Sequence, residues 1–320
     1  MIKTNTLFIL GAGASVPFGY PTGNDLRDEI LAIMDYYEDD IDHGDDIDNN
    51  DIIDAYTKWY LQKNKNMFVS NSLNIFKEKF EGSSDYSIDA FLEHRPEFMD
   101  LGKIYIARIL ISFEVDKKLR SIKDNRYIHL FDRMKTSFGE LGKNNISFIT
   151  FNYDRSLEYF LSKAIEDKFT KSPKESAEMM KNFPIVHLYG RLDPLPWQEK
   201  NGREYSATKN LTHHLMAAPE NIKLISNERD IDKSPEFKEA YKLIEEAKRI
   251  FFLGFSFDET NLGRLKIELM RSKLVQATAQ GLKGAKRTWI ENYFRSRCNT
   301  NINLVQTDAL SLLEDHLEIE

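Results

Sequence analysis

The sequence contains one cysteine, Cys298, among its 320 residues. A single thiol can form no internal disulfide and no zinc site built from several cysteines. Long apolar runs are also missing near the start, where only Thr6 to Leu10 is hydrophobic before the glycines begin. That stretch is too short for a signal peptide or a membrane span, so we expect a cytoplasmic protein with no membrane association.

Positive charge is in deficit, with 44 lysines and arginines against 51 acidic residues and a formal net charge of -7. General nucleic-acid binders need a basic surface that displaces counterions from phosphates, so direct nucleic-acid binding is not expected, although a local basic patch stays possible. Hydrophobic residues make up 41% of the chain. That share is enough for a full core in one large domain or two lobes.

Residues 35–54 are rich in aspartate and asparagine, which is typical of a solvated loop. A calcium-binding loop is the alternative, because Asp40 and Asp42 alternate as such ligands do. However, Gly44 falls one position early for that motif, and no glutamate closes the loop. We therefore expect no metal site here.

Strand and helix patterns alternate over much of the chain. Apolar runs predict strands at 6–10, 146–151, 185–188, 249–257 and 302–306, and amphipathic patterns predict helices from about Thr22, over 154–168 and over 235–248. Residues 55–140 have a helical composition. The sequence thus predicts an α/β, Rossmann-like parallel sheet with helices on both faces, formed by residues 1–34 and 145–320 and interrupted by a helical insertion lobe at 35–144.

A small-residue loop follows the first predicted strand directly, with the sequence Gly11-Ala12-Gly13-Ala14-Ser15. At the carboxyl end of a parallel strand, such residues let backbone N–H groups approach a pyrophosphate. The loop lacks the third glycine of the dehydrogenase fingerprint, and no ribose-binding acid is evident about 20 residues later. A plain strand-to-helix turn remains the alternative.

Polar or small residues also follow the other predicted strands. Asn152 and Asp154 follow one, His187 interrupts another just before a glycine, and Gly254 and Ser256 end a third. Taken singly, Asp154 could simply cap a helix and His187 could be a core histidine. Together they would meet at one edge of one sheet, in a topology that binds nucleotides.

With these segments in order, the sequence resembles the sirtuin family, and more closely its divergent bacterial branch of sirtuin-like NADases found in antiviral defence systems. The matching motifs are GAGAS at 11–15, SIDAFL at 87–92, TFNYD at 150–154, HLYG at 187–190 and GFSF at 254–257. The resemblance covers most of the chain in the order of the family.

The resemblance implies NAD+ as the substrate and a role for each matching residue. It implies Gly11, Ala12, Gly13 and Ser15 around the pyrophosphate, Asn152 and Asp154 at the nicotinamide ribose, His187 as general base, Gly254 and Ser256 at the adenosine half, and Asp308 and Ala309 at the adenine. Thr22 and Phe151 complete the predicted cofactor-binding set. No metal is implied.

Two departures from protein-deacylating sirtuins change the expected reaction. The zinc-binding cysteine pairs are absent, and Tyr20-Pro21-Thr22-Gly23 stands where those enzymes have a phenylalanine-arginine pair. We therefore expect hydrolysis of NAD+ to nicotinamide and ADP-ribose, or a cyclised ADP-ribose. A deacylase or ADP-ribosyltransferase, and a module that senses NAD or ADP-ribose without chemistry, remain alternatives. A metal hydrolase is disfavoured because His213 and His214 are adjacent and point to different helix faces.

An unrestrained NADase would deplete its own cell. The resemblance therefore leads us to expect a NAD-depleting effector of anti-phage defence that is controlled by homo-oligomerisation or by a separate activating protein. The helical lobe is the expected contact surface.

Overall fold

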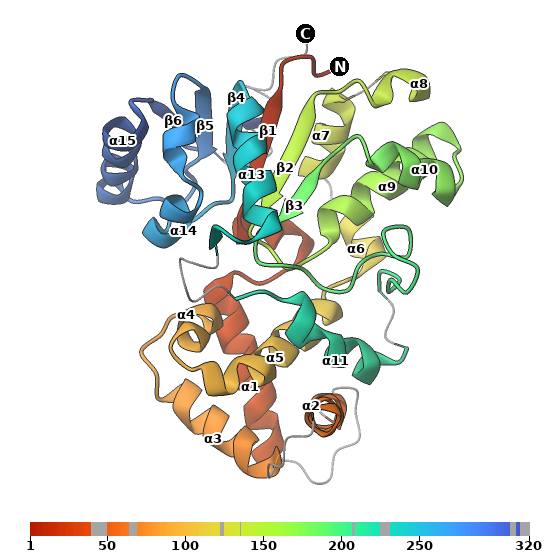
Figure 1. Ribbon diagram of the computed structural model, residues 1–320, viewed down its shortest axis with the longest axis vertical. Coiled ribbons are helices and arrows are strands. Elements are labelled where there is room, and N and C mark those ends of the chain that lie inside the picture. Colours follow the sequence, from red (N-terminus) through yellow and green to blue (C-terminus); the bar gives the residue numbers. More distant parts are fainter. Residues whose placement is uncertain are drawn as a thin grey trace. The chain divides into compact units, whose positions relative to one another are not determined.

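The computed structural model describes residues 1–39, 50–63, 69–121, 125–134, 136–206, 209–224, 231–307 and 312–313. The chain divides into two compact units (Figure 1). The sheet unit comprises residues 1–18, 117–188 and 227–320, and the helical unit comprises residues 19–116 and 189–226. Compared with the expected domain ranges, residues 117–144 belong with the sheet, whereas 19–34 and 189–226 belong with the helices.

The sheet unit is built on six parallel strands. They are β1 (Thr6–Leu10), β2 (Ile146–Thr150), β3 (Ile185–His187), β4 (Arg249–Leu253), β5 (Leu274–Thr278) and β6 (Ile302–Val305), and their order across the sheet is β3-β2-β1-β4-β5-β6. This order is that of the dinucleotide-binding fold, in which successive strands are added to one side of β1 up to β3 and to its other side from β4 onward. The predicted α/β, Rossmann-like architecture is confirmed.

The central strands form because their residues are apolar on both faces. All five residues of β1 are buried, and the ring of Phe8 stacks on Phe148 of β2 at 5.6 Å and on Phe251 of β4 at 5.3 Å. β4 ends at Leu253 rather than at Phe257, because Gly254 takes a left-handed φ of +59°. β5 was not predicted, because Gln276 and Thr278 interrupt its apolar pattern.

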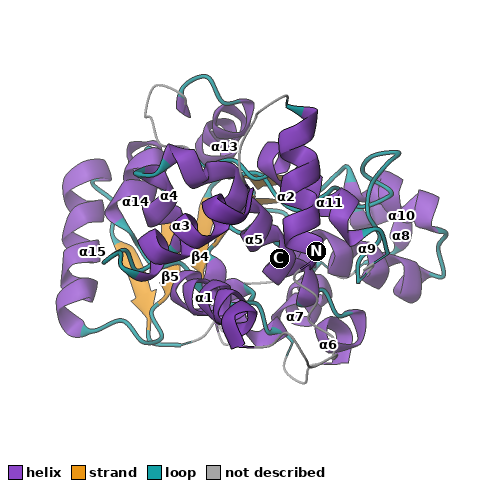
Figure 2. Ribbon diagram, turned by 90° about the horizontal axis from the view of Figure 1, so that it is seen from below, coloured by secondary structure: helices purple, strands orange, loops and turns teal. Residues whose placement is uncertain are grey.

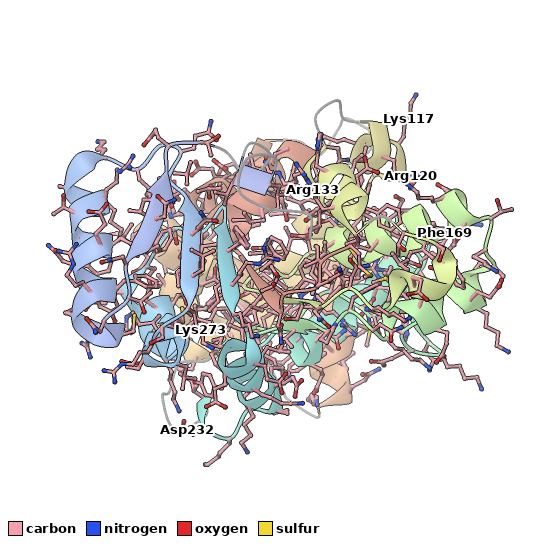
Figure 3. All side chains as sticks on the ribbon, turned by 90° about the horizontal axis from the view of Figure 1, so that it is seen from above. Lys117, Arg120, Arg133, Phe169, Asp232 and Lys273 are labelled. Carbon is pink, nitrogen blue, oxygen red and sulfur yellow. The ribbon has the colours of Figure 1, made fainter. Side chains whose placement is uncertain are left out.

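Helices cover both faces of the sheet. The longer ones are α7 (Arg126–Arg133), α9 (Ser156–Phe169), α10 (Pro173–Met180), α13 (Pro235–Glu246) and α15 (Gly284–Cys298); the shorter ones are η1 (Ala12–Ala14), η2 (Val16–Phe18), α6 (Asp116–Ser121), α8 (Phe138–Leu141), α14 (Glu259–Arg264) and η4 (Ile267–Met270). Right-handed crossovers place helices on opposite faces when the strand order reverses. Seen from above, Arg133 of α7 and Asp232, which precedes α13, lie on opposite sides of the strands (Figure 3).

The helical unit has a core of its own. Its elements are α1 (Gly23–Asp39), α2 (Asn50–Gln62), α3 (Val69–Glu81), α4 (Ile88–Glu93), η3 (Pro96–Phe98), α5 (Met99–Ser112) and α11 (Leu211–Asn221), drawn as helices in Figure 2. α11 packs against α2 and α5. Stacked and edge-on rings join Phe76, Phe80, Phe91, Phe98 and Tyr105. No helix among the described residues combines the length and apolarity needed to cross a membrane.

The acidic segment 35–54 is only partly described, and the described part is helical rather than a loop. α1 continues to Asp39, and α2 begins at Asn50. The prediction of a loop is therefore wrong at both ends of the segment. In α2, the buried stripe of Ile52, Ala55 and Tyr56 outweighs the local aspartates, because burial of an apolar face stabilises a helix more than intrinsic propensity does. Residues 40–49, including the rejected calcium motif, lie outside the described residues.

Candidate active site

The glycines of the predicted nucleotide loop pack directly against the end of β4. A Cβ on Gly11 would lie 2.6 Å from the Gly254 carbonyl oxygen, and one on Gly13 would lie 2.9 Å from the Gly254 Cα. The N–H of Gly11 donates to the Leu253 carbonyl at 3.1 Å, and the N–H of Gly13 donates to the Gly254 carbonyl at 3.0 Å. Close packing between the ends of β1 and β4 thus explains these glycines without any ligand.

These internal bonds leave few backbone donors for a pyrophosphate. Besides Gly11 and Gly13, the N–H of Ala14 donates to Gly11 at 2.8 Å and that of Ser15 donates to Ala12 at 2.9 Å. Within the described part of the chain, the N–H of Ala12 has no acceptor, and Ala12 is half-buried. The expected cradle of several N–H groups therefore reduces to one.

The loop after β2 places the side chain of Asn152 beside the glycine loop. Its Nδ2 donates to the Gly11 carbonyl and to Ser15 Oγ, each at 3.1 Å. A carbonyl can only accept a hydrogen bond, so the contact with Gly11 fixes which end of the amide faces the loop. Oδ1 then has no donor among the described residues, and Asn152 is half-exposed. The site therefore offers an acceptor at this position.

Asp154 lies behind Asn152 as the buried end of a chain of hydroxyl groups. Ser15 Oγ donates to Oδ2 at 2.8 Å, while both the N–H and the hydroxyl of Ser156 donate to Oδ1. The Tyr127 hydroxyl lies 3.1 Å from Ser156 Oγ. Asp154 is buried, and its bond to the Ser156 N–H anchors the start of α9. The contact of Asp154 with the nicotinamide ribose, which the resemblance implies, stays a prediction.

Burial raises the pKa of Asp154 above the usual value of about 3.9, although the bonds from Ser156 and Ser15 oppose the shift. Between these two pKa values the folded protein binds a proton that the unfolded chain does not, so the free energy of unfolding falls as pH rises. We expect Asp154→Asn to remove this fall. Urea unfolding of wild type and Asp154→Asn from about pH 4 upward measures the free energy of unfolding at each pH. If that free energy depends on pH in the same way in both proteins, the raised pKa of Asp154 is wrong.

An exposed carboxylate gives a control of opposite sign. Hydrogen bonds from Lys171 and from Ser172 hold the pKa of Glu175 down to about 2. This group therefore stabilises the fold above the usual glutamate pKa and loses that contribution as pH falls. Relative to wild type, Glu175→Gln should lose stability as pH rises, whereas Asp154→Asn should gain it.

His187 is the last residue of β3, and its ring contacts the main chain of Asn152. Its Nδ1 lies 3.0 Å from the main-chain oxygen of Asn152, and its Nε2 lies 3.1 Å from Oε1 of Glu158 on α9. The imidazole is buried, and both ring nitrogens are engaged. A general-base role, which stays a prediction, would require the ring to give up one of these contacts.

The other predicted site residues are distributed as follows. Phe151 packs edge-on against Phe255 at 5.0 Å, which joins the loops after β2 and β4, and Ser256 is exposed. The N–H of Gly254 donates to Thr278 Oγ1 of β5 at 3.0 Å. Thr22 belongs to the helical unit, where it caps α1 with Asp25. Asp308 and Ala309 lie outside the described residues.

Sequence reasoning missed two buried charged residues at this site. Glu158 contacts His187, and Arg126 on α7 donates from Nη1 to the Gly13 carbonyl at 3.0 Å. Glu158 lies four residues after Asp154, and an acid on the buried face of the predicted helix was a usable signal. The sequence contained no comparable signal for Arg126, because α7 reaches the glycine loop only through the tertiary fold.

The adjacent histidines that argued against a metal hydrolase, His213 and His214, lie in the helical unit. His214 Nδ1 contacts Asp193 Oδ2 at 2.6 Å, whereas His213 is exposed. No cluster of three or more histidine, cysteine, aspartate or glutamate side chains suited to a metal occurs among the residues that the structure describes.

Comparison with known proteins adds no family to this picture. No protein-family model and no curated protein matches the chain.

Proposed function

We propose that this protein is an NAD+ glycohydrolase that releases nicotinamide. The observation that carries the proposal is the Oδ1 of the half-exposed Asn152, held at the strand edge by the bonds of its Nδ2 to the glycine loop. In a sheet of this strand order, a dinucleotide binds outside the carboxyl ends of β1 and β4. Ala12, Gly13, Asn152 and Gly254 are all half-buried at this edge, so each keeps some surface that a ligand there would reach.

Nicotinamide in NAD+ is already a cationic leaving group, so bond cleavage depends on stabilising an oxocarbenium-like ribose more than on acid assistance. The Asn152 Oδ1 would supply this stabilisation, because a fixed carbonyl dipole presents its negative end to the developing charge. It would equally accept a hydrogen bond from a ribose hydroxyl or from the attacking water. Gly11 and Ser15 prevent the amide from turning away.

Substitution of Asn152 tests this role directly. We expect Asn152→Ala to lower nicotinamide release by about 10²- to 10³-fold, the loss typical of one preorganised polar group. The matched control is Asn182→Ala on a different loop. It also removes a hydrogen bond from a side-chain amide to a main-chain carbonyl, that of Met179. Nicotinamide is quantified by mass spectrometry, and circular dichroism checks folding. Equal turnover by the two variants would refute the assignment.

One observation favours a second candidate, a module that binds NAD or ADP-ribose without chemistry. Both ring nitrogens of His187 and most N–H groups of the glycine loop are already bonded within the protein. Calorimetric binding of NAD+ with no nicotinamide released, also after addition of acyl-peptide or acceptor protein, would select this candidate over the NADase, the deacylase and the ADP-ribosyltransferase.

We further propose that the protein is an antiviral effector whose activity depends on homo-oligomerisation or on an activating protein, because constitutive hydrolysis would exhaust cellular NAD+. Turnover per chain should then rise with protein concentration or on adding the activator. Full turnover by dilute, monomeric protein would exclude this control.

A further inference from the structure

The contact between His187 and Glu158 extends the site inward from Asn152. Glu158 is the third residue of α9, and its carboxylate lies 3.1 Å from His187 Nε2. The two side chains are only 1% and 4% exposed, respectively. A buried carboxylate is costly unless it is paired and hydrogen-bonded, so this pairing is a specific feature of the fold.

The opposite side of the imidazole determines where the ring protons lie. Nδ1 faces the main-chain oxygen of Asn152, which can only accept a hydrogen bond, so Nδ1 must carry a proton. At Nε2 the remaining proton sits either on the ring, facing a carboxylate, or on Glu158, facing the ring lone pair. In both arrangements the ring connects Glu158 to the backbone of Asn152.

We infer that Glu158 is a positioning residue, which orients the His187 ring so that Nδ1–H keeps donating to the Asn152 carbonyl, and thereby fixes the loop that presents Asn152. The carboxylate, the imidazole and the Asn152 carbonyl form one continuous brace from α9 through β3 to the loop after β2. A group that orients a histidine through its far nitrogen also sets what its near nitrogen donates to. The inference rests on the proposed function only for its kinetic consequence.

Among the residues that the structure describes, no other group forms a hydrogen bond with the imidazole. α13 packs against β3 and buries only apolar side chains, namely Phe237, Ala240, Leu243 and Ile244, while its charged residues lie on its other faces. The buried charged or titratable residues nearby are Asp154 and Arg155 ahead of α9, and Arg126 and Tyr127 on α7. Asp154 is bonded to Ser15 and Ser156, and Tyr127 to Ser156.

The test compares Glu158→Ala with Glu158→Gln. A glutamine amide can donate to Nε2 and keep the Nδ1–H form, whereas alanine releases the ring. Nitrogen-15 spectra of the imidazole, assigned from the signal lost in His187→Gln, should show Nδ1–H in the wild type and in Glu158→Gln and a mixture of tautomers in Glu158→Ala. Exchange of the Asn152 amide proton, which donates to Thr150 Oγ1 at 3.0 Å, should quicken only in Glu158→Ala.

Turnover provides the kinetic arm of the same experiment. Glu158→Ala should lower kcat for nicotinamide release at least about tenfold with little change in KM, because a displaced Asn152 is misaligned with the bound substrate. Glu158→Gln should retain most of kcat. The matched control is Glu166→Ala, which removes a carboxylate of the same helix that is paired with Lys163 at 2.8 Å. It should change none of the three readouts.

The outcomes separate the brace from the proposed function. An unprotonated Nδ1 in the wild type overturns the brace even if Glu158→Ala fails to fold. Unchanged tautomers and amide exchange in folded Glu158→Ala also overturn it. If no variant and no wild-type protein releases nicotinamide while the tautomers change as expected, the brace stands and the proposed hydrolase function fails.

Discussion

Gly254→Ala should destabilise the sheet unit by roughly 4 kcal/mol, near the upper end of single substitutions. Gly254 has a φ of +59°, and a left-handed conformation alone costs a residue with a Cβ about 1–2 kcal/mol. The added Cβ would also lie 2.1 Å from the Ala14 nitrogen and 2.2 Å from the Gly13 carbonyl carbon. These atoms belong to the backbone, so the glycine loop must move away from β4. Urea or guanidinium unfolding measures the loss.

The matched control is Gly263→Ala in α14. A Cβ there would meet no atom within 4 Å, and alanine is the better helix former by about 1 kcal/mol. We therefore expect a neutral or slightly stabilising effect. If Gly254→Ala unfolds at the same denaturant concentration as wild type, the close packing of the two strand ends is wrong, and with it the placement of the glycine loop.

Glu114→Ala should destabilise the helical unit by about 3–5 kcal/mol. Glu114 Oε2 lies 2.6 Å from Arg203 Nη1, and the two side chains are 0% and 1% exposed. Removal of the acid leaves the guanidinium buried, with Asp193 as a carboxylate at the longer distance of 3.5 Å. A buried cation that has lost its closest counter-ion costs far more than the net value of the pair.

An exposed pair of similar geometry is the control. Glu178 and Lys181 lie 2.5 Å apart but are 74% and 70% exposed, so Glu178→Ala should change the free energy of unfolding by less than about 1 kcal/mol. Both variants are compared by denaturant unfolding. Similar small losses for the two would mean that Arg203 finds an equivalent partner or reaches water.

The sheet was predictable because its signals are local. β1 and β4 are mostly apolar runs, and each is followed by a glycine, of which Gly254 interrupts the strand geometry with its positive φ. Such runs are typical of parallel strands buried on both faces, and the helical stretches between them favour crossovers. β5 was missed because it lacks such a local signal: Gln276 and Thr278 are polar residues buried within the strand.

The acidic segment shows a limit of composition as a guide. Its aspartates indicated a loop, yet α1 and α2 extend into it from both sides. Helix ends depend on the apolar stripe that a helix buries against other elements, and that partner surface cannot be read from the segment itself. The split of residues 117–144 and 189–226 between the two units likewise depends on long-range packing.

The sequence alone determined that a glycine loop, Asn152 and His187 lie at the carboxyl ends of three strands, and parallel strands bring those ends to one edge. Only the tertiary structure decided what these residues do there. It packs Gly11 and Gly13 against Gly254 and orients the Asn152 amide so that its nitrogen, not its oxygen, bonds the glycine loop. It also places the Glu158 carboxylate against Nε2 of His187. The physical reason is that spacing along the chain sets which residues reach an edge, whereas hydrogen-bond partners depend on contacts between distant segments.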